Sequence, residues 1–142
     1  MYISTEKLTY WYFRLNGFLT IENFVVHPRD GHKERTEIDL IAARFPNRSE
    51  LYPGKSMQDD DRLKIGFGKI RIILSEATTR RCKLNEALIK PENQNIERVL
   101  WALGAFECDK VYDVSKKLYG QGWYEDDEFA VSLCALGKQN NA

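Results

Sequence analysis

The sequence predicts one domain of the mixed α/β (α+β) class over residues 1–142, with a central mixed four-stranded sheet flanked by helices. Two segments of strand length, 36–43 and 70–78, are apolar and lie between turn-rich loops. The second segment is also rich in β-branched residues, which favours a strand over a buried helix. Amphipathic segments with helical spacing precede and follow the pair. The length is that of one domain with a full core, and no internal repeat divides it.

The predicted elements follow the order αβββααβ. The first helix begins at Ser4 or Thr5, either of which can cap it, and ends at Gly17. Its apolar positions follow the i, i+3, i+4, i+7 spacing, so we expect them to face the core. These positions are Leu8, Trp11, Tyr12 and Leu15.

Three strands follow, at 18–26, 36–43 and 70–78. A polar loop over 27–35 joins the first two strands and makes them neighbours in the sheet. A longer loop over 45–64 precedes the third strand, and loops of this length are functional or mobile. It contains the acidic run Asp59-Asp60-Asp61, which is typical of a solvated surface and lacks the spacing of a calcium loop.

The second half of the chain predicts two helices and a final strand at 128–136. One helix presents a face from Ile96 to Phe106, and the other carries Val111, Val114 and Leu118 before ending at Gly120. The aromatic residues around Gly120 and Gly122 fit an exposed loop and packing over a sheet edge equally well.

Composition excludes several classes of protein. Lys plus Arg equals Asp plus Glu, so overall charge gives no support for nucleic-acid binding, although a local basic patch is compatible with it. No apolar run approaches the roughly 20 residues of a membrane span, and we expect no membrane partner. The three cysteines are widely spaced, which predicts reduced, mostly buried thiols and a cytoplasmic location.

Two acidic residues, Asp39 and Glu76, are each set inside one of the apolar strands. An ionised carboxylate in a strand that is buried on both faces is costly unless a cation or metal ion compensates it. Because both strands carry such an acid, we expect one shared cause, a divalent-metal site. Carboxylates from adjacent strands are the hard oxygen ligands that Mg²⁺ takes. Mg²⁺ or Mn²⁺ is therefore the predicted cofactor.

Three segments carry a resemblance to a known family. They are Leu-Asn-Gly-Phe at 15–18, Thr-Glu-Ile-Asp-Leu-Ile-Ala at 36–42 and Ile-Leu-Ser-Glu-Ala-Thr at 73–78. Together they resemble the PD-(D/E)XK, or restriction-endonuclease-like, nuclease superfamily. The resemblance implies a restriction-endonuclease-like core in which Asp39 and Glu76 are the two acids that hold the metal. Glu6 matches the helix-one glutamate of archaeal Holliday-junction resolvases of this superfamily, which implies an outer metal ligand.

The chain departs from the superfamily at Thr78, where the motif has lysine. Threonine cannot carry the positive charge that orients the attacking water or stabilises the transition state. Arg80 has the strand parity of Glu76, and Lys83 follows in the next turn, so either could supply a displaced cation. With Arg81 these residues form the densest positive charge in the chain and predict contact with phosphate.

The function implied by the resemblance is a metal-dependent nuclease that hydrolyses phosphodiester bonds in DNA or RNA, with activity attenuated by the loss of lysine. The alternative is a catalytically inactive member of the fold that binds nucleic acid or protein, for which a homodimer is possible. A third reading is an unrelated αβ interaction protein whose buried acids pair with Arg44 or Arg71. This last reading predicts that Asp39 and Glu76 lie apart or that each forms a salt bridge.

Overall fold

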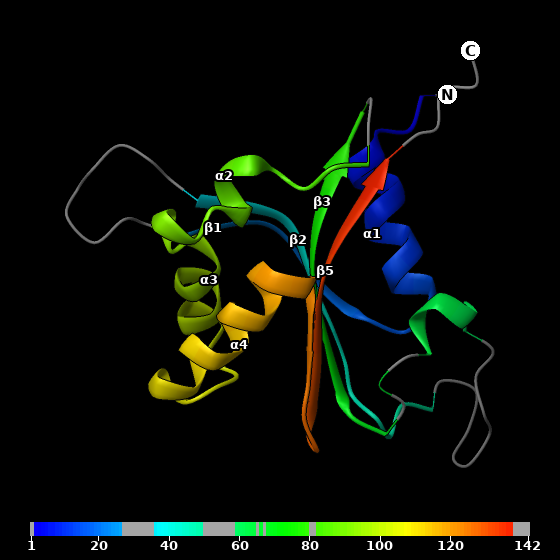
Figure 1. Cartoon of the computed structure of the whole chain (residues 1–142). Coiled ribbons are helices and arrows are strands. Elements are labelled where there is room, and N and C mark those ends of the chain that lie inside the picture. The colour runs from blue at the N-terminus through cyan, green and yellow to red at the C-terminus, as the bar shows by residue number, and fades with distance from the viewer. Residues whose placement is uncertain are drawn as a thin grey trace.

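One central sheet forms the middle layer of the molecule, and helices cover both of its faces (Figure 1). The computed structural model of the chain describes residues 2–26, 36–49, 59–64, 66, 68–79 and 82–137. In chain order the elements are α1 (Thr5–Leu15), β1 (Leu19–Val26), β2 (Thr36–Arg44), the 3-10 turn Asp61–Leu63, β3 (Ile70–Thr78), α2 (Glu86–Ile89), the 3-10 turn Pro91–Asn93, α3 (Asn95–Leu103), α4 (Cys108–Gln121), β4 (Trp123–Glu125) and β5 (Phe129–Gly137).

The predicted mixed sheet is confirmed, but it has five strands, in the order β1-β2-β3-β5-β4. Strands β1, β2 and β3 pair antiparallel, and β5 then pairs parallel with β3. The prediction of four strands was wrong because of β4, a three-residue strand that pairs antiparallel with β5. A strand this short cannot show the period-two alternation that identifies strands in a sequence.

Helix α1 begins where the sequence predicts, but it faces the core differently. The Ser4 hydroxyl accepts a hydrogen bond from the Lys7 N–H, as an N-cap does. The buried residues of α1 are Thr5, Thr9 and Phe13, which follow an i, i+4, i+8 spacing. Three of the four residues of the predicted core face are exposed instead, and Tyr12 is half-buried. The exposed residues are Leu8, Trp11 and Leu15.

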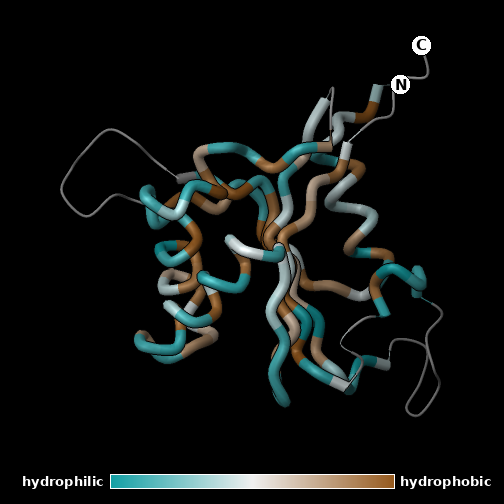
Figure 2. The backbone as a smooth tube through the Cα atoms, viewed as in Figure 1, coloured by the Kyte–Doolittle hydropathy of each residue, from teal (hydrophilic) through white to brown (hydrophobic). Residues whose placement is uncertain are grey.

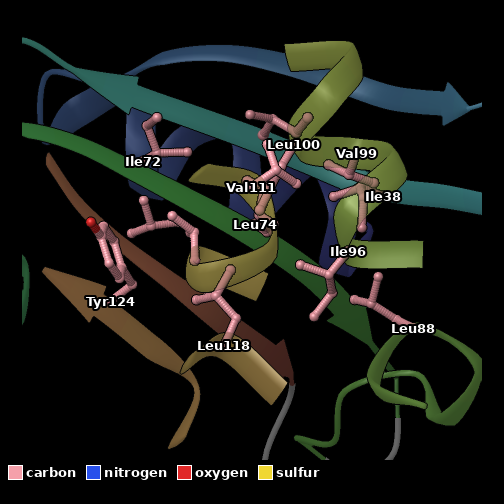
Figure 3. Packing of buried hydrophobic residues seen from close by; sticks show 13 residues of the cluster. Ile38, Ile72, Leu74, Leu88, Ile96, Val99, Leu100, Val111, Leu118 and Tyr124 are labelled. Atoms are coloured by element: carbon pink, nitrogen blue, oxygen red, sulfur yellow. The ribbon is translucent and has the colours of Figure 1, made fainter. Parts of the chain in front are cut away.

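Two hydrophobic clusters pack against the two faces of the sheet. On the face covered by α1, the Phe13 and Phe18 rings pack edge-to-face, with centroids 5.4 Å apart, over Leu40 and Ile73. The larger cluster fills the space between the other face and the helices α2, α3 and α4 (Figure 3). Figure 2 shows that hydrophobic residues are concentrated along the strands and on the inward sides of these helices.

The helices of the second half end at residues other than those predicted. Helix α3 ends at Leu103, and Gly104 follows in the left-handed region with φ of 73°. Phe106 therefore packs on the core from a loop and is not part of the helix. Helix α4 continues past Gly120 and is capped by Gly122, whose φ of 84° suits glycine.

None of the helices in the described part of the chain is both long and apolar enough to cross a membrane. The cysteines are free thiols, but Cys82 and Cys108 are exposed and Cys134 is half-buried, so the prediction that they are mostly buried was wrong. Their sequence neighbours are strongly polar at Cys82 and Cys108, and these two lie outside the sheet.

Candidate functional site

The acids Asp39 and Glu76 lie where β2 and β3 separate. The β2–β3 ladder runs from Arg44↔Arg71 to Leu40↔Ser75. Beyond this ladder, the Asp39 side chain connects the two strands. Its Oδ2 accepts a hydrogen bond of 2.7 Å from the Ala77 backbone N–H on β3. A side chain thus continues the connection between the strands and is held in one orientation by it.

A change in strand alternation accompanies this separation. Leu40 packs in the cluster beneath α1, whereas Ile38, two residues earlier, packs with α3 in the opposite cluster. In a regular strand, residues two apart face the same side. On the neighbouring β1, Asn23 has φ of 53° and is skipped in the register between Glu22↔Leu40 and Phe24↔Ile38. Both strands therefore bend at the level of Asp39, toward α2 and α3 and away from the end of β3 (Figure 1).

Glu76 is a buried carboxyl group with no compensating cation among the described residues. Only 7% of the residue is exposed. Its Oε1 is buried and has no hydrogen-bond partner among the described residues. Burial, together with the charge of the neighbouring Asp39 and a hydrogen bond with it, raises the pKa of Glu76 from 4.5 to about 8. Glu76 is consequently protonated at neutral pH, next to an acid that is held by a backbone N–H.

A third carboxylate at this site was missed in the sequence. Glu37 is exposed on β2, and its charge also raises the pKa of Glu76. The sequence did indicate that Glu37 is near the pair, because Glu37 and Asp39 are two positions apart in a predicted strand and such residues commonly share a face. The bend in β2 makes that inference from spacing unreliable here, and only the structure establishes the electrostatic contact.

Of the two residues expected to supply a cation, Arg80 and Lys83, the structure describes Lys83 and does not bring it to the acids. Lys83 is exposed and makes no hydrogen bond or ion pair with Asp39 or Glu76. Thr78, in the position of the motif lysine, has its hydroxyl 3.5 Å from the Leu136 carbonyl of β5. Arg80 and Arg81 lie outside the described residues.

The outer ligand Glu6 is also not joined to the pair. It is exposed in the first turn of α1, and no hydrogen bond or ion pair within the described ranges links it to Asp39 or Glu76. A carboxylate in this position complements the positive end of the helix dipole. That role explains an acid at position 6 without any contact between Glu6 and a metal ion.

The arginines offered as partners for the acids are engaged elsewhere. Arg44 forms an ion pair of 3.0 Å with Asp59, and Arg71 donates a hydrogen bond of 3.1 Å to the Ser132 hydroxyl. The alternative of an unrelated αβ interaction protein predicts that Asp39 and Glu76 lie far apart or that each forms a salt bridge. The described residues show neither, because the two acids interact with each other.

The donor set fits a hard divalent cation. Mg²⁺ is usually held by one or two carboxylates, with waters completing its coordination. Asp39 and Glu76 supply two, and the unsatisfied Glu76 Oε1 is a buried oxygen that such an ion would compensate. Within the ranges that the structure describes, no third His, Cys, Asp or Glu completes a larger ligand group.

Comparisons of the chain with protein-family models, with curated proteins and with solved structures found no significant match.

Proposed function

We propose that this protein is a metal-dependent, nuclease-like domain in which Asp39 and Glu76 bind Mg²⁺ or Mn²⁺ and act on phosphodiester bonds of DNA or RNA. The observation that supports the proposal is the convergence of two acids from separating strands, one of them buried and with no cation beside it in the described part of the chain. A buried carboxyl group beside a second acid is costly for folding alone, so the presence of the pair favours a role in binding.

The chain's own residues would position the reaction. The Ala77 N–H fixes the Asp39 carboxylate, and the apolar surroundings of Glu76 exclude water from its carboxyl group. A divalent ion bound between them would act as a Lewis acid and lower the pKa of a water molecule. Without a lysine at Thr78, stabilisation of the phosphate charge would fall to the arginines at 80 and 81, and we expect slow turnover.

Metal binding is the first test of this proposal. Titration calorimetry with Mg²⁺ and Mn²⁺ is expected to show one site in the wild type that is lost in Asp39→Ala. Asp61→Ala is the matched control, because the Asp61 side chain is 90% exposed and pairs with Lys64, and it should bind as the wild type does. If the folded wild type binds neither Mg²⁺ nor Mn²⁺ at millimolar concentration, the proposal of a metal-dependent enzyme is rejected.

The second candidate function is a catalytically silent module of the same fold that binds nucleic acid or protein. Thr78 favours this second candidate, because its hydroxyl lies near the Leu136 carbonyl of β5 and because threonine lacks the positive charge of the motif lysine. The two candidates are separated by Thr78→Lys, assayed on single- and double-stranded DNA and on RNA with Mn²⁺.

If the acid pair is a working metal site, restoring lysine should raise cleavage at least about tenfold, as expected for one positioned charge. The double variant Glu76→Gln/Thr78→Lys should abolish the gain. Metal binding without cleavage in Thr78→Lys would support the silent module, provided that the variant unfolds at the temperature of the wild type.

A further inference from the structure

The two edges of the sheet differ in how far they are protected. Strand β1 forms one edge and β4 the other. An edge strand presents unpaired backbone N–H and C=O groups, and proteins usually blunt such edges with short strands, charges, proline or a cover. The edges of this sheet follow that rule on one side only.

The β4 edge is protected. It is three residues long, and Glu125 forms an ion pair of 2.7 Å with Lys69. The acidic run 126–128 follows at once, and the Asp126 carboxylate accepts hydrogen bonds from the N–H groups of Glu128 and Phe129. Charge and a tight turn therefore both oppose the addition of another strand here.

The β1 edge has none of these features. It is eight residues long, contains neither lysine nor proline, and carries Glu22 as its one charge. Leu19 and Ile21 are 58% and 51% exposed, although they lie in the strand and face the same side. No described residue pairs with its outer edge, since β1 has β2 as its only partner in the sheet that the structure describes. Long, apolar and unprotected edges are sites of strand pairing.

We propose that β1 pairs antiparallel with β1 of a second copy of this chain, about a two-fold axis at Ile21. This register places Ile21 opposite Ile21, Thr20 opposite Glu22 and Leu19 opposite Asn23, so apolar residues meet at the centre and no like charges face each other. Centring the axis on Glu22 would instead bring two carboxylates together, which is unfavourable. The sequence around Ile21 is thus complementary to itself, as an isologous interface requires.

Two further observations favour a second copy as the occupant. The formal net charge of the chain is zero, so two copies approach without overall repulsion. The left-handed Asn23, with φ of 53°, interrupts the regular strand and limits the pairing to residues 19–23. Two-fold pairing uses this edge in both copies, and the protected β4 edges remain outermost. The assembly therefore closes as a dimer and does not extend into a fibre.

Sedimentation equilibrium of the full chain tests the proposal. We expect a reversible dimer with a dissociation constant between about 1 and 100 μM, as for a small interface. Ile21→Lys places two ammonium groups on the axis and should give a monomer with an unchanged unfolding temperature. Ile89→Lys, at an exposed isoleucine of α2, should leave the dimer intact. A wild type that is monomeric at about 100 μM would overturn the proposal, because the interface would be too weak to matter.

Cross-linking then tests the register. In a background of Cys82→Ser and Cys108→Ser, which removes the two exposed thiols, Ile21→Cys should form a covalent dimer on mild oxidation. Residues opposite each other in an antiparallel pair have Cα atoms about 4.5–5.5 Å apart, within the range of a disulfide. Ile89→Cys in the same background should not. A dimer that fails to cross-link through residue 21 would show that the copies meet elsewhere.

Discussion

The strand pair β2–β3 carries charge at both ends, and the two ends are compensated in different ways. At one end the acids Asp39 and Glu76 meet with no described cation beside them. At the other, Arg44 lies directly opposite Arg71 in the antiparallel register. Two arginines opposite each other are unfavourable, and so is an ionised Glu76 beside Asp39. Among the described residues, a side chain of opposite charge reaches only the basic end, where it pairs with Arg44.

The loop that follows β2 supplies a carboxylate to Arg44 at the basic end, whereas the Nε of Arg71 is buried without a hydrogen-bond partner among the described residues. Asp59 bridges two arginines, with Oδ2 3.0 Å from Arg44 and Oδ1 2.8 Å from Arg48. Arg48 also donates to the Asn16 carbonyl at the end of α1. The prediction that the run 59–61 is a solvated surface was therefore wrong for Asp59, whose side chain is 15% exposed.

The rest of the acidic run varies in exposure. Asp60 accepts hydrogen bonds from the Tyr12 hydroxyl and the Arg62 N–H, and its own N–H donates to the Asn16 side chain. Asp61 is 90% exposed in its pair with Lys64 and fits the predicted solvated character.

The contrast separates structural charge from functional charge. A neutral total charge results from 21 basic and 21 acidic residues, but the described residues place an opposite charge beside Arg44 and Arg48 at the basic end and none beside the acids. An unpaired buried carboxyl group lowers stability whenever it ionises. We infer that the acidic end is kept for binding and the basic end for attaching the long loop to α1 and the sheet. Three predictions test this division.

The largest effect is expected at the basic end. Asp59→Ala leaves Arg44 and Arg48 largely buried, at 12% and 14% side-chain exposure, without their shared carboxylate. Removing one partner of a buried pair typically costs about 3 kcal/mol or more of unfolding free energy. Urea unfolding at neutral pH measures this. Asp61→Ala, the exposed control, should change stability by less than about 0.5 kcal/mol. Equal effects for both variants would remove the distinction between paired and solvated acids.

An intermediate effect, with a defined pH dependence, is expected at the acidic end. The folded pKa of Glu76 is raised to about 8, above its ordinary value of 4.5, so the folded state binds the proton more tightly. Its contribution to stability is therefore complete below the lower value and is lost as the pH rises through the higher one. Glu76→Gln cannot ionise, and at a pH of about 9 it should be more stable than the wild type by about 3 kcal/mol.

The measurement for Glu76→Gln is the unfolding free energy across the pH range between acidic and alkaline conditions. Below a pH of about 4 the variant and the wild type should differ little, because the Glu76 carboxyl group is then protonated in both the folded and the unfolded state. Glu128→Gln, at an exposed acid, is the control and should give a curve parallel to that of the wild type. Parallel curves for Glu76→Gln as well would mean that the carboxyl group is not buried with Asp39.

The smallest effect concerns the hinge between α1 and the arginine network. Gly17 has φ of 81°, and a Cβ built there would lie 1.3 Å from Nη1 of Arg48. Gly17→Ala should cost about 1–3 kcal/mol, since it strains the backbone and displaces the guanidinium from Asn16 and Asp59. Gly120→Ala has open space and lies inside α4, so it should be neutral or stabilising. Thermal unfolding compares the two, and equal shifts would contradict the close approach at Gly17.

The pattern of apolar residues and the positions of turn-forming residues were sufficient to predict most helices and strands. Strands β2, β3 and β5 coincide with the predicted segments because each is a continuous apolar run between turn residues. The face of α1 could not be predicted in the same way. Its spacing of Leu8, Trp11 and Leu15 is helical, but which face packs depends on what the helix meets, and the Phe13 ring reaches Phe18.

The candidate site divides along the same line. The identity of Asp39 and Glu76 as acids in apolar strands was readable because a buried charge is conspicuous against its neighbours. The sequence could not predict three other features, because they depend on how the strands separate in space. These are the bend at Asn23, the hydrogen bond from the Ala77 N–H and the effect of the Glu37 charge on the pKa of Glu76.

The sequence by itself therefore determined the class of fold, the position of its main strands and the two acids at its centre. Tertiary structure alone decided which charges are compensated. Asp59 and Asp39 are both aspartates near a strand end, yet one meets two guanidinium groups and the other a backbone N–H and a buried carboxyl group. Electrostatic energy depends on distance and burial, which are set by contacts between residues far apart in the chain.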